Sequence, residues 1–462
     1  MLTFAEHEFM PVGQGLFAVG AIGQSDDDAP RFRWVFDCGT LSGPALVEGA
    51  LDRLEADVKR GSAGKPSLDL VAISHFDTDH LSGLADLLKR FRVEILMLPF
   101  THLAQRLGYM YSRRQYTAKV DRAYYIDPIG TILGIEGVDI GQILLVPPSN
   151  AKPVSDQRDP PTAPTLPPGL NDERRREPER LVFDEDDVED AFDRVELEVM
   201  RASAAPRHVP VRVMKAGSAA TCLGVWEFVP YNEPRSTSKA TADFLHRVEA
   251  KRAALLLSSS PEARTVAISE LRKTYDLHFG DSAKARNVIS LYLYSGPIAR
   301  HLQTLSVGQN PLMTVNRNCM WGCPICWENW FDATQLPCVG DASGVLYTGD
   351  GYVNKQSRWD EMQYYFGKQR TARLVALQVM HHGARANWFK GIAKLIGPTI
   401  SVFSSDPERG TRPKKGKLNG SANAARKPHE PHPHADVLQD FGPYYPVQAD
   451  KFQGVQILTT YG

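Results

Sequence analysis

The strongest constraint on this chain is a cluster of ionisable residues that directly follows an apolar run. The run LDLVAI leads into SHFDTDHLSGL at residues 74–84, which holds two histidines and two aspartates within six positions. Such a short apolar run is typical of a buried strand, and the residues after the cluster favour a helix. Strands and helical segments alternate along residues 1–150, which predicts an α/β fold with a polar site beyond the sheet edge.

Three later segments bring the same residue types to the ends of further predicted strands or to a helix start. YTGDG places Asp350 after one strand, LQVMHHG places His381 and His382 after another, and HPH at residues 432–434 precedes a predicted helix. An isolated Asp/His cluster is most simply explained as a capped helix start beside a surface histidine. Because strand ends meet at one edge of an α/β sheet, the later segments favour a shared metal site instead.

The order of these motifs resembles the metallo-β-lactamase fold superfamily. Its usual signature is His-x-His-x-Asp-His, and Asp77 replaces the second histidine here. This variant, followed by Gly-Asp, His-His-Gly and HPH, is similar to one branch: the hydrolase domain of the DNA-uptake channel protein of competent bacteria, with its soluble relatives. VGQG at residues 12–15, VFDCG with Asp37, and NVISLYL fit the same branch in the same order.

The resemblance implies an αββα sandwich that is interrupted by additions. Composition places the additions, since one segment is rich in Pro and charge and another is rich in cysteine. The predicted parts are the N-terminal half of the sandwich at 1–148, a Pro/charge-rich flexible excursion at 149–190, a continuation at 191–296 with a helical insertion at about 236–285, a four-cysteine zinc-binding insertion at 297–342, and the C-terminal half at 343–462.

The resemblance also implies a centre for two divalent metal ions. His75 and Asp77 are expected to hold one ion and Asp79 and His80 the second, with Asp350 bridging both. The full set of expected ligands is His75, Asp77, Asp79, His80, Asp350, His381, His382 and His432.

Further roles at this centre follow from the same resemblance. Asp37 is expected to brace the loop that carries the histidines, and Asp79, Asp350 and His382 to take part in catalysis. The sequence leaves open which of His381 and His382 binds metal, and the other histidine could contact a phosphate. A carboxylate in place of the usual histidine shifts the preference from zinc toward manganese, with zinc still open.

Four of the six cysteines lie within 20 residues, at Cys319, Cys323, Cys326 and Cys338. Their spacing predicts one structural zinc ion held by four thiolates. Buried apolar cysteines are one alternative, and a redox role for the Cys-x2-Cys pair is another, although no thioredoxin-like context surrounds it. Tryptophans in the same segment could stack on bases or pack around the zinc.

A basic segment at residues 409–427 contains seven Lys or Arg residues and no acidic residue. It lies between two strand-end motifs and is therefore expected to overhang the metal site. Arg412, Lys414, Lys415 and Lys417 are predicted to bind nucleic acid, since phosphates attract such a cluster. A solvated loop with no ligand is the other interpretation.

Charge and hydropathy restrict the partners and the location of the chain. The formal net charge is −1, which excludes a general attraction to polyanions and leaves only local patches. No apolar run approaches the roughly 20 residues that a membrane span needs. The N-terminal residues lack the basic-then-apolar order of a signal peptide, so we expect a cytoplasmic protein without membrane contact.

These features together predict a metal-dependent phosphodiesterase, foremost a nuclease that uses a metal-bound hydroxide. Analogy of fold extends this to an effector of bacterial antiviral defence. A hydrolase of another ester, lactone or thioester is one alternative, because Pro11 and Leu16 stand where the branch usually has acidic residues. A non-enzymatic subunit that binds partners through the four-cysteine lobe or the helical insertion is the other.

Overall fold

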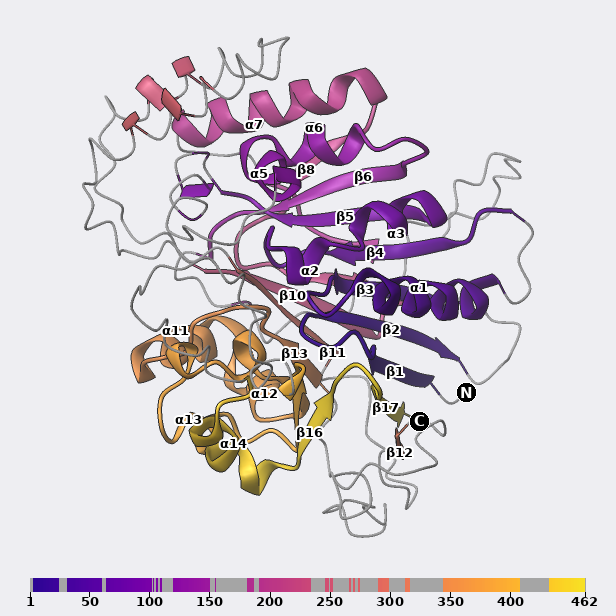
Figure 1. Cartoon of the computed structure of the whole chain (residues 1–462), viewed down its shortest axis with the longest axis vertical. Helices are drawn as coiled ribbons and strands as arrows, with labels where there is room; N and C mark the ends of the chain where they lie inside the picture. Colours follow the sequence, from indigo (N-terminus) through magenta and orange to yellow (C-terminus); the bar gives the residue numbers. More distant parts are fainter. Residues whose placement is uncertain are drawn as a thin grey trace, which may run out of the picture.

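A computed structural model shows how the chain is arranged in space (Figure 1). It describes residues 3–24, 31–59, 64–101, 119–149, 181–186, 191–233, 290–298, 312–315, 344–407 and 432–461, with single residues or short pieces between 103 and 109, at 154, and between 246 and 274. Within these residues the fold is mixed α/β, as the sequence predicts, with two β-sheets of nine and eight strands.

The nine-stranded sheet combines the N-terminal part of the chain with its last strand. Strand β1 pairs antiparallel with both β2 and β17, while β3, β4, β5, β6 and β8 run parallel to one another. In spatial order the strands are β12 (Leu312–Val315), β17 (Val455–Tyr461), β1 (Thr3–Phe9), β2 (Phe17–Gln24), β3 (Phe32–Cys38), β4 (Ser67–Ala72), β5 (Arg92–Pro99), β6 (Asp139–Val146) and β8 (Val211–Val213).

The eight-stranded sheet is mixed in the same way. Strands β13 to β16 run parallel, and β10 and β11 pair antiparallel. In spatial order the strands are β16 (Pro446–Ala449), β15 (Ile400–Ser404), β14 (Leu374–Gln378), β13 (Gly344–Tyr347), β11 (Leu291–Pro297), β10 (Trp226–Asn232), β9 (Ala220–Cys222) and β7 (Leu181–Val182). The inner strand β14 is buried along its whole length, as expected for a parallel strand covered on both faces.

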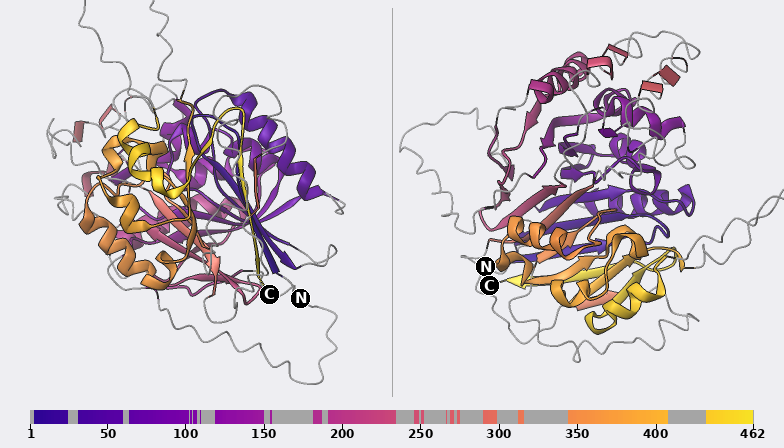
Figure 2. Two further views of the ribbon diagram at one scale, coloured as in Figure 1. Left: turned by 90° about the horizontal axis from the view of Figure 1, so that it is seen from below. Right: turned by 90° about the vertical axis from the view of Figure 1, so that its left-hand side faces the viewer.

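Helices cover the outer face of each sheet, and the two sheets pack against each other (Figure 2). The nine-stranded sheet is covered by α1 (Pro44–Lys59), α2 (Thr78–Leu81), α3 (Leu84–Arg90), α5 (Lys119–Ile126), α6 (Pro128–Leu133) and α7 (Ala191–Ala204). The other is covered by α11 (Gln356–Phe366), α13 (Ile392–Ile396) and α14 (Ala435–Phe441), and α12 (Lys368–Thr371) packs against α11. Three hydrophobic clusters therefore separate four layers, and the middle cluster joins Trp34 of one sheet to Phe228 of the other.

Several predicted segments lie outside the described residues. These are the four cysteines at Cys319, Cys323, Cys326 and Cys338, the basic residues Arg412, Lys414, Lys415 and Lys417, and most of the segments at 149–190 and 236–285. Among the helices that are described, none combines the length and apolar character needed to cross a membrane.

Candidate metal centre

The histidine-bearing loop joins the end of β4 to α2, and a buried carboxylate holds it from the neighbouring strand. Asp37 at the end of β3 adopts a left-handed backbone conformation, with φ of 56°. Its carboxylate accepts hydrogen bonds from the backbone N–H of Ser74 (2.7 Å), the Ser74 hydroxyl (2.6 Å) and Nδ1–H of His80 (2.7 Å). We expected Asp37 to brace this loop, and these contacts place it where it can do so.

The second sheet presents Asp350 on a tight turn that follows β13. The side-chain oxygen of Gln378 accepts hydrogen bonds from the backbone N–H groups of Thr348 and Gly349, both at 2.8 Å. Gly349 has φ of 52°, and a Cβ at this position would lie 2.8 Å from the Ser74 side chain. Glycine therefore lets the turns of the two sheets approach closely, which brings Asp350 against the histidine-bearing loop.

His381 and His382 follow β14 in a short 3-10 segment with an unusual backbone. Both residues have positive φ, 46° and 56°, a conformation that costs of order 1–3 kcal/mol and persists only where the surroundings impose it. Nδ1–H of His382 donates to the backbone carbonyl of Ser404 at 2.5 Å, and Nδ1–H of His381 donates to the side-chain oxygen of Asn387 at 3.0 Å. The Asn387 amide also donates to the backbone carbonyl of Asp350 at 2.9 Å, which ties this turn to the β13 turn.

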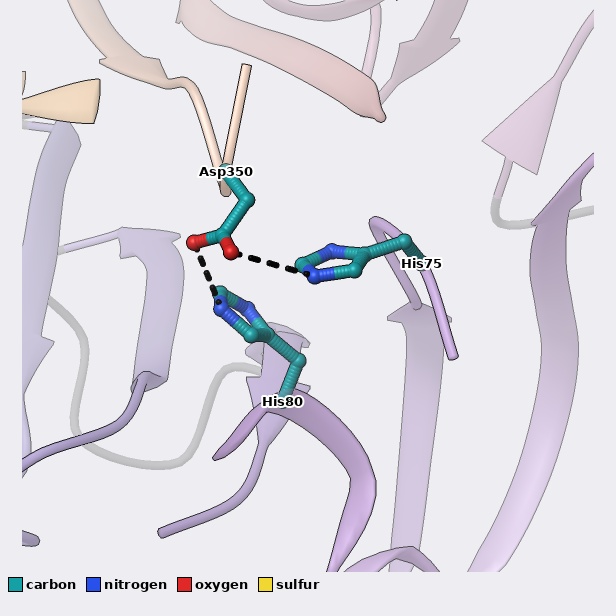
Figure 3. Close-up of side chains that lie close together, drawn as sticks. All are labelled: His75, His80 and Asp350. Atoms are coloured by element: carbon teal, nitrogen blue, oxygen red, sulfur yellow. Dashed lines mark hydrogen bonds and ion pairs between the residues drawn. The ribbon is translucent and has the colours of Figure 1, made fainter. Parts of the chain in front are cut away.

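Four histidine side chains converge on the carboxylate of Asp350. Its Oδ1 lies 3.0 Å from Nε2 of His80 and 3.6 Å from Nε2 of His382. Its Oδ2 lies 3.5 Å from Nε2 of His75 and 3.3 Å from Nε2 of His381. Figure 3 shows Asp350 facing His75 and His80, which come from the opposite sheet.

The tautomers of these histidines follow from the partners of their Nδ1 atoms. The partners of His80 and His382 are a carboxylate and a backbone carbonyl, which can only accept a hydrogen bond. The Ser74 hydroxyl donates to Asp37, so it accepts from Nδ1–H of His75 at 2.8 Å. In neutral histidines each Nε2 therefore carries a lone pair that faces a carboxylate, an arrangement that requires a cation between them, either a proton or a metal ion.

The pKa directions show how strongly the centre favours positive charge. Burial lowers the pKa of His80, but Asp350 and Asp37 outweigh it and raise that pKa well above its ordinary value. Burial and His80 likewise lower the pKa of His75, but the nearby carboxylates of Asp350 and Asp77 raise it overall. Burial raises the pKa of Asp350, but His381, His80 and His75 outweigh burial and hold that pKa well below its ordinary value.

Within the described residues, two sets of three side chains have the geometry of metal ligands. One consists of His75, His80 and Asp350, and the other of Asp79, His80 and His382, with the candidate ligand atoms of each set within 4.8 Å of one another. The Nε2 atoms of His75 and His382 are buried and have no hydrogen-bond partner within the described part of the chain. The donor set of imidazole nitrogens and carboxylate oxygens suits zinc or manganese, so these residues fit a divalent ion.

The structure brings together most of the residues predicted from sequence, but groups them differently. We expected His80 to serve one ion with Asp79; it belongs to that set and also to the set of His75 and Asp350, although the single lone pair on its Nε2 can bind only one ion. His382 is buried and its Nε2 points into the centre, while the side chain of His381 is 22% exposed and its ring stacks on His432 at 5.9 Å. The geometry thus favours His382 as the ligand of the pair and puts His381 and His432 at the rim.

Asp77 lies beside His75 but makes contacts that the sequence did not indicate. Its Oδ2 is 3.5 Å from Nε2 of His75 and accepts a hydrogen bond from the Tyr109 hydroxyl at 2.9 Å. Its Oδ1 accepts one from the Tyr125 hydroxyl at 2.6 Å. Neither tyrosine belongs to a spacing pattern that could have marked it, and the same holds for Asn387, which follows β14. Ser74, by contrast, lies directly beside the Asp/His cluster in the sequence.

Comparisons with known proteins add no identification. A scan against protein-family models finds no family that matches this chain. A search of curated proteins finds no significant match. The chemistry of the centre therefore rests on its own geometry.

Proposed function

We propose that this protein is a metal-dependent hydrolase of the metallo-β-lactamase fold that cleaves phosphodiesters, with nucleic acid as its substrate. The observation that carries the proposal is the convergence of the Nε2 atoms of four histidines on the Asp350 carboxylate. The Nδ1–H group of each of these histidines donates to a hydrogen-bond acceptor. Two face-to-face sheets with helices on both outer faces are compatible with that fold, as is the order of the sequence motifs.

The residues of the centre divide the work of holding and orienting the reactants. Two divalent ions bound there would polarise a phosphoryl group and acidify a water molecule. Asp350 would hold both ions, because each of its oxygens faces different histidines. The hydrogen bonds that Asp37 and Ser404 accept fix the orientation of His80 and His382, so little reorganisation is needed when the ions bind.

The exposed rim of the centre supports a polyanionic substrate. The described residues end before the basic segment, shortly after Ser404, whose carbonyl contacts His382, and resume after it at His432, whose ring stacks on His381. The described residues on both sides of this segment therefore include ones that contact histidines of the centre. The segment's seven positive charges are within the same short stretch of chain, which supports contact with substrate phosphates.

The test is hydrolysis of single- and double-stranded DNA and RNA by metal-free protein reloaded with Mn²⁺ or Zn²⁺. We expect metal-dependent cleavage by the wild type and a loss of about 1000-fold or more in Asp350→Ala, because both ions lose a ligand. Asp86→Asn is the matched control, since this aspartate has a side chain that is 64% exposed on α3. Cleavage of esters but of no nucleic acid with either metal would replace this function with the ester-hydrolase alternative.

The role of the basic segment is tested separately by Lys414→Ser, Lys415→Ser and Lys417→Ser together. For every lysine–phosphate interaction that the triple variant removes, the slope of log affinity against log salt should fall by about 0.7–0.9. Hydrolysis of a small chromogenic phosphodiester should change little, since such a substrate needs no contact far from the metals. Equal salt slopes for the wild type and the triple variant would contradict a role in nucleic-acid binding.

A further inference from the structure

Asp77 is a buried carboxylate with two phenol donors. It is 5% exposed, and an ionised carboxylate so far from water is stable only when its oxygens are hydrogen-bonded or paired with a cation. The Tyr125 hydroxyl donates to one oxygen at 2.6 Å and the Tyr109 hydroxyl to the other at 2.9 Å. Each oxygen has a second lone pair, so Oδ2, which faces Nε2 of His75 at 3.5 Å, can still bind a metal ion.

The two tyrosines come from different segments and pack as one unit. Tyr109 lies in the short described pieces after β5, and Tyr125 lies near the end of α5. Their rings stack with centroids 5.6 Å apart, and the Tyr125 ring meets Phe76 edge-on at 5.7 Å. Phe76 directly precedes Asp77, so the same packing sets the position of the carboxylate and of its donors.

A buried arginine joins the segments that carry the two tyrosines. Arg106, three residues before Tyr109, is fully buried and donates to the backbone carbonyl of Tyr125 at 2.8 Å. It also forms an ion pair with Glu196 of α7 at 2.7 Å, and both side chains are almost completely buried. Burying such a pair is costly, and here it fixes the distance between the two phenols that hold Asp77.

We propose that Tyr109 and Tyr125 are positioning residues for the metal centre, forming a phenol clamp that presents Asp77 to an ion bound by His75 and His80. The clamp, defined as these two hydroxyls on Asp77, rests on the proposed function because it presupposes a bound ion. It acts on one side of the centre only. Both phenols donate to Asp77, whereas the second ion would be held by Asp79 and His382.

The experiment titrates metal-free protein with Mn²⁺ and measures the Mn²⁺ that remains free. It compares the wild type with the double variant Tyr109→Phe/Tyr125→Phe. The double variant should bind one of two ions about 10- to 100-fold more weakly, the usual effect of removing a hydrogen bond to a ligand. The other ion should keep its affinity within about twofold, as expected for a site whose own contacts are unchanged. Tyr365→Phe is the matched control, because its buried hydroxyl donates to the carbonyl of Pro230 on the other sheet at 3.0 Å.

Two further variants identify the ion and guard against a general loss of structure. In an Asp79→Asn background, the remaining ion should be the one that the tyrosine substitutions weaken. The single variant Tyr109→Phe, which keeps the shorter bond from Tyr125, should show a smaller loss than the double variant.

The outcomes separate the clamp from the proposed function. Two ions bound with wild-type affinity by the double variant would overturn the clamp and leave the hydrolase proposal intact. Equal weakening of both ions would also overturn it, since that result indicates a structural role alone. If the wild type bound no ion at the Asp/His centre, the proposed function would fail first and the clamp with it.

Discussion

Asp77 and Asp79 are two residues apart on the same turn, and the structure treats them differently. Both are buried, but Asp77 accepts hydrogen bonds from two phenols that come from separate segments. Among the described residues, the carboxylate of Asp79 has one ionic contact, with Nε2 of His382 at 3.4 Å. The Asp77 side is therefore rigid before any ion arrives, whereas the Asp79 side depends on the ion to complete it, and the two ions should differ in affinity.

The largest effect is expected from a substitution that removes the ion pair supporting the Asp77 side. Arg106→Met leaves Glu196 buried without its partner, which should lower the free energy of unfolding by about 3–5 kcal/mol. Arg106→Met/Glu196→Met should recover most of that loss, because no uncompensated charge remains. Urea unfolding of the three proteins measures this, and a single variant as stable as the wild type would show that the pair does not support the clamp.

A smaller effect separates the two sides directly. Asp77→Asn and Asp79→Asn should each weaken a different ion by about 10- to 100-fold. The loss of Mn²⁺ affinity in Asp77→Asn should not add to the loss in Tyr109→Phe/Tyr125→Phe, since these changes act on one hydrogen-bonded unit. The loss in Asp79→Asn should add to it. Mn²⁺ binding by the single and combined variants decides this, and simple additivity on both sides would remove the contrast between them.

The smallest effect is the pH dependence of the metal-free protein. The pKa values of His80 and His75 are raised in the folded protein, so the protonated histidines stabilise the fold. This contribution is fully present below about pH 6.5, the ordinary pKa of histidine, and is lost as the pH rises through the folded pKa values. Burial raises the pKa of Glu8 and Glu233 to about 7, which also lowers stability as pH rises from 4.5. The lowered pKa of Asp350 acts at low pH, because the stability that the ionised carboxylate contributes is present above about pH 3.8 and is lost as the pH falls through its folded pKa.

Thermal unfolding from pH 5 to 9 tests these signs. The Tm of the metal-free protein should fall as pH rises, while bound Mn²⁺ should stabilise the protein more at higher pH, because metal ions compete with protons for Nε2. A metal-free protein that gained stability between pH 6.5 and 8.5 would show that the histidines are not held in the protonated form.

Sequence patterns predicted the parts of the centre that depend on strand ends. The alternation of strands and helices led to the α/β class, and the ends of β4, β13 and β14 carry the Asp and His residues that meet at the centre. Each group directly follows its own strand in the sequence, so residue types and motif order were enough to mark it. The left-handed backbone at His381 and His382, which decides how each ring points, has no such signature in a single sequence.

Other partners depend on packing between distant segments. Tyr109 and Tyr125 reach Asp77 only because stacked rings and the buried Arg106 hold two segments together. Asn387 reaches the Asp350 turn because β13 and β14 are neighbours in the sheet. The position of His80 within reach of both sets of candidate ligands likewise follows from the approach of one sheet to the other, which Gly349 permits and no local pattern encodes.

The central claim is that the Nε2 atoms around Asp350 are built to receive two metal ions rather than protons. Counting bound Mn²⁺ in wild-type protein at neutral pH tests it most directly, because manganese binds thiolates poorly and reports the Asp/His centre alone. The account predicts two ions per chain with unequal affinities, and their loss in Asp350→Ala. Failure to bind Mn²⁺ or Zn²⁺ there, with His75 and His80 protonated throughout, would contradict it.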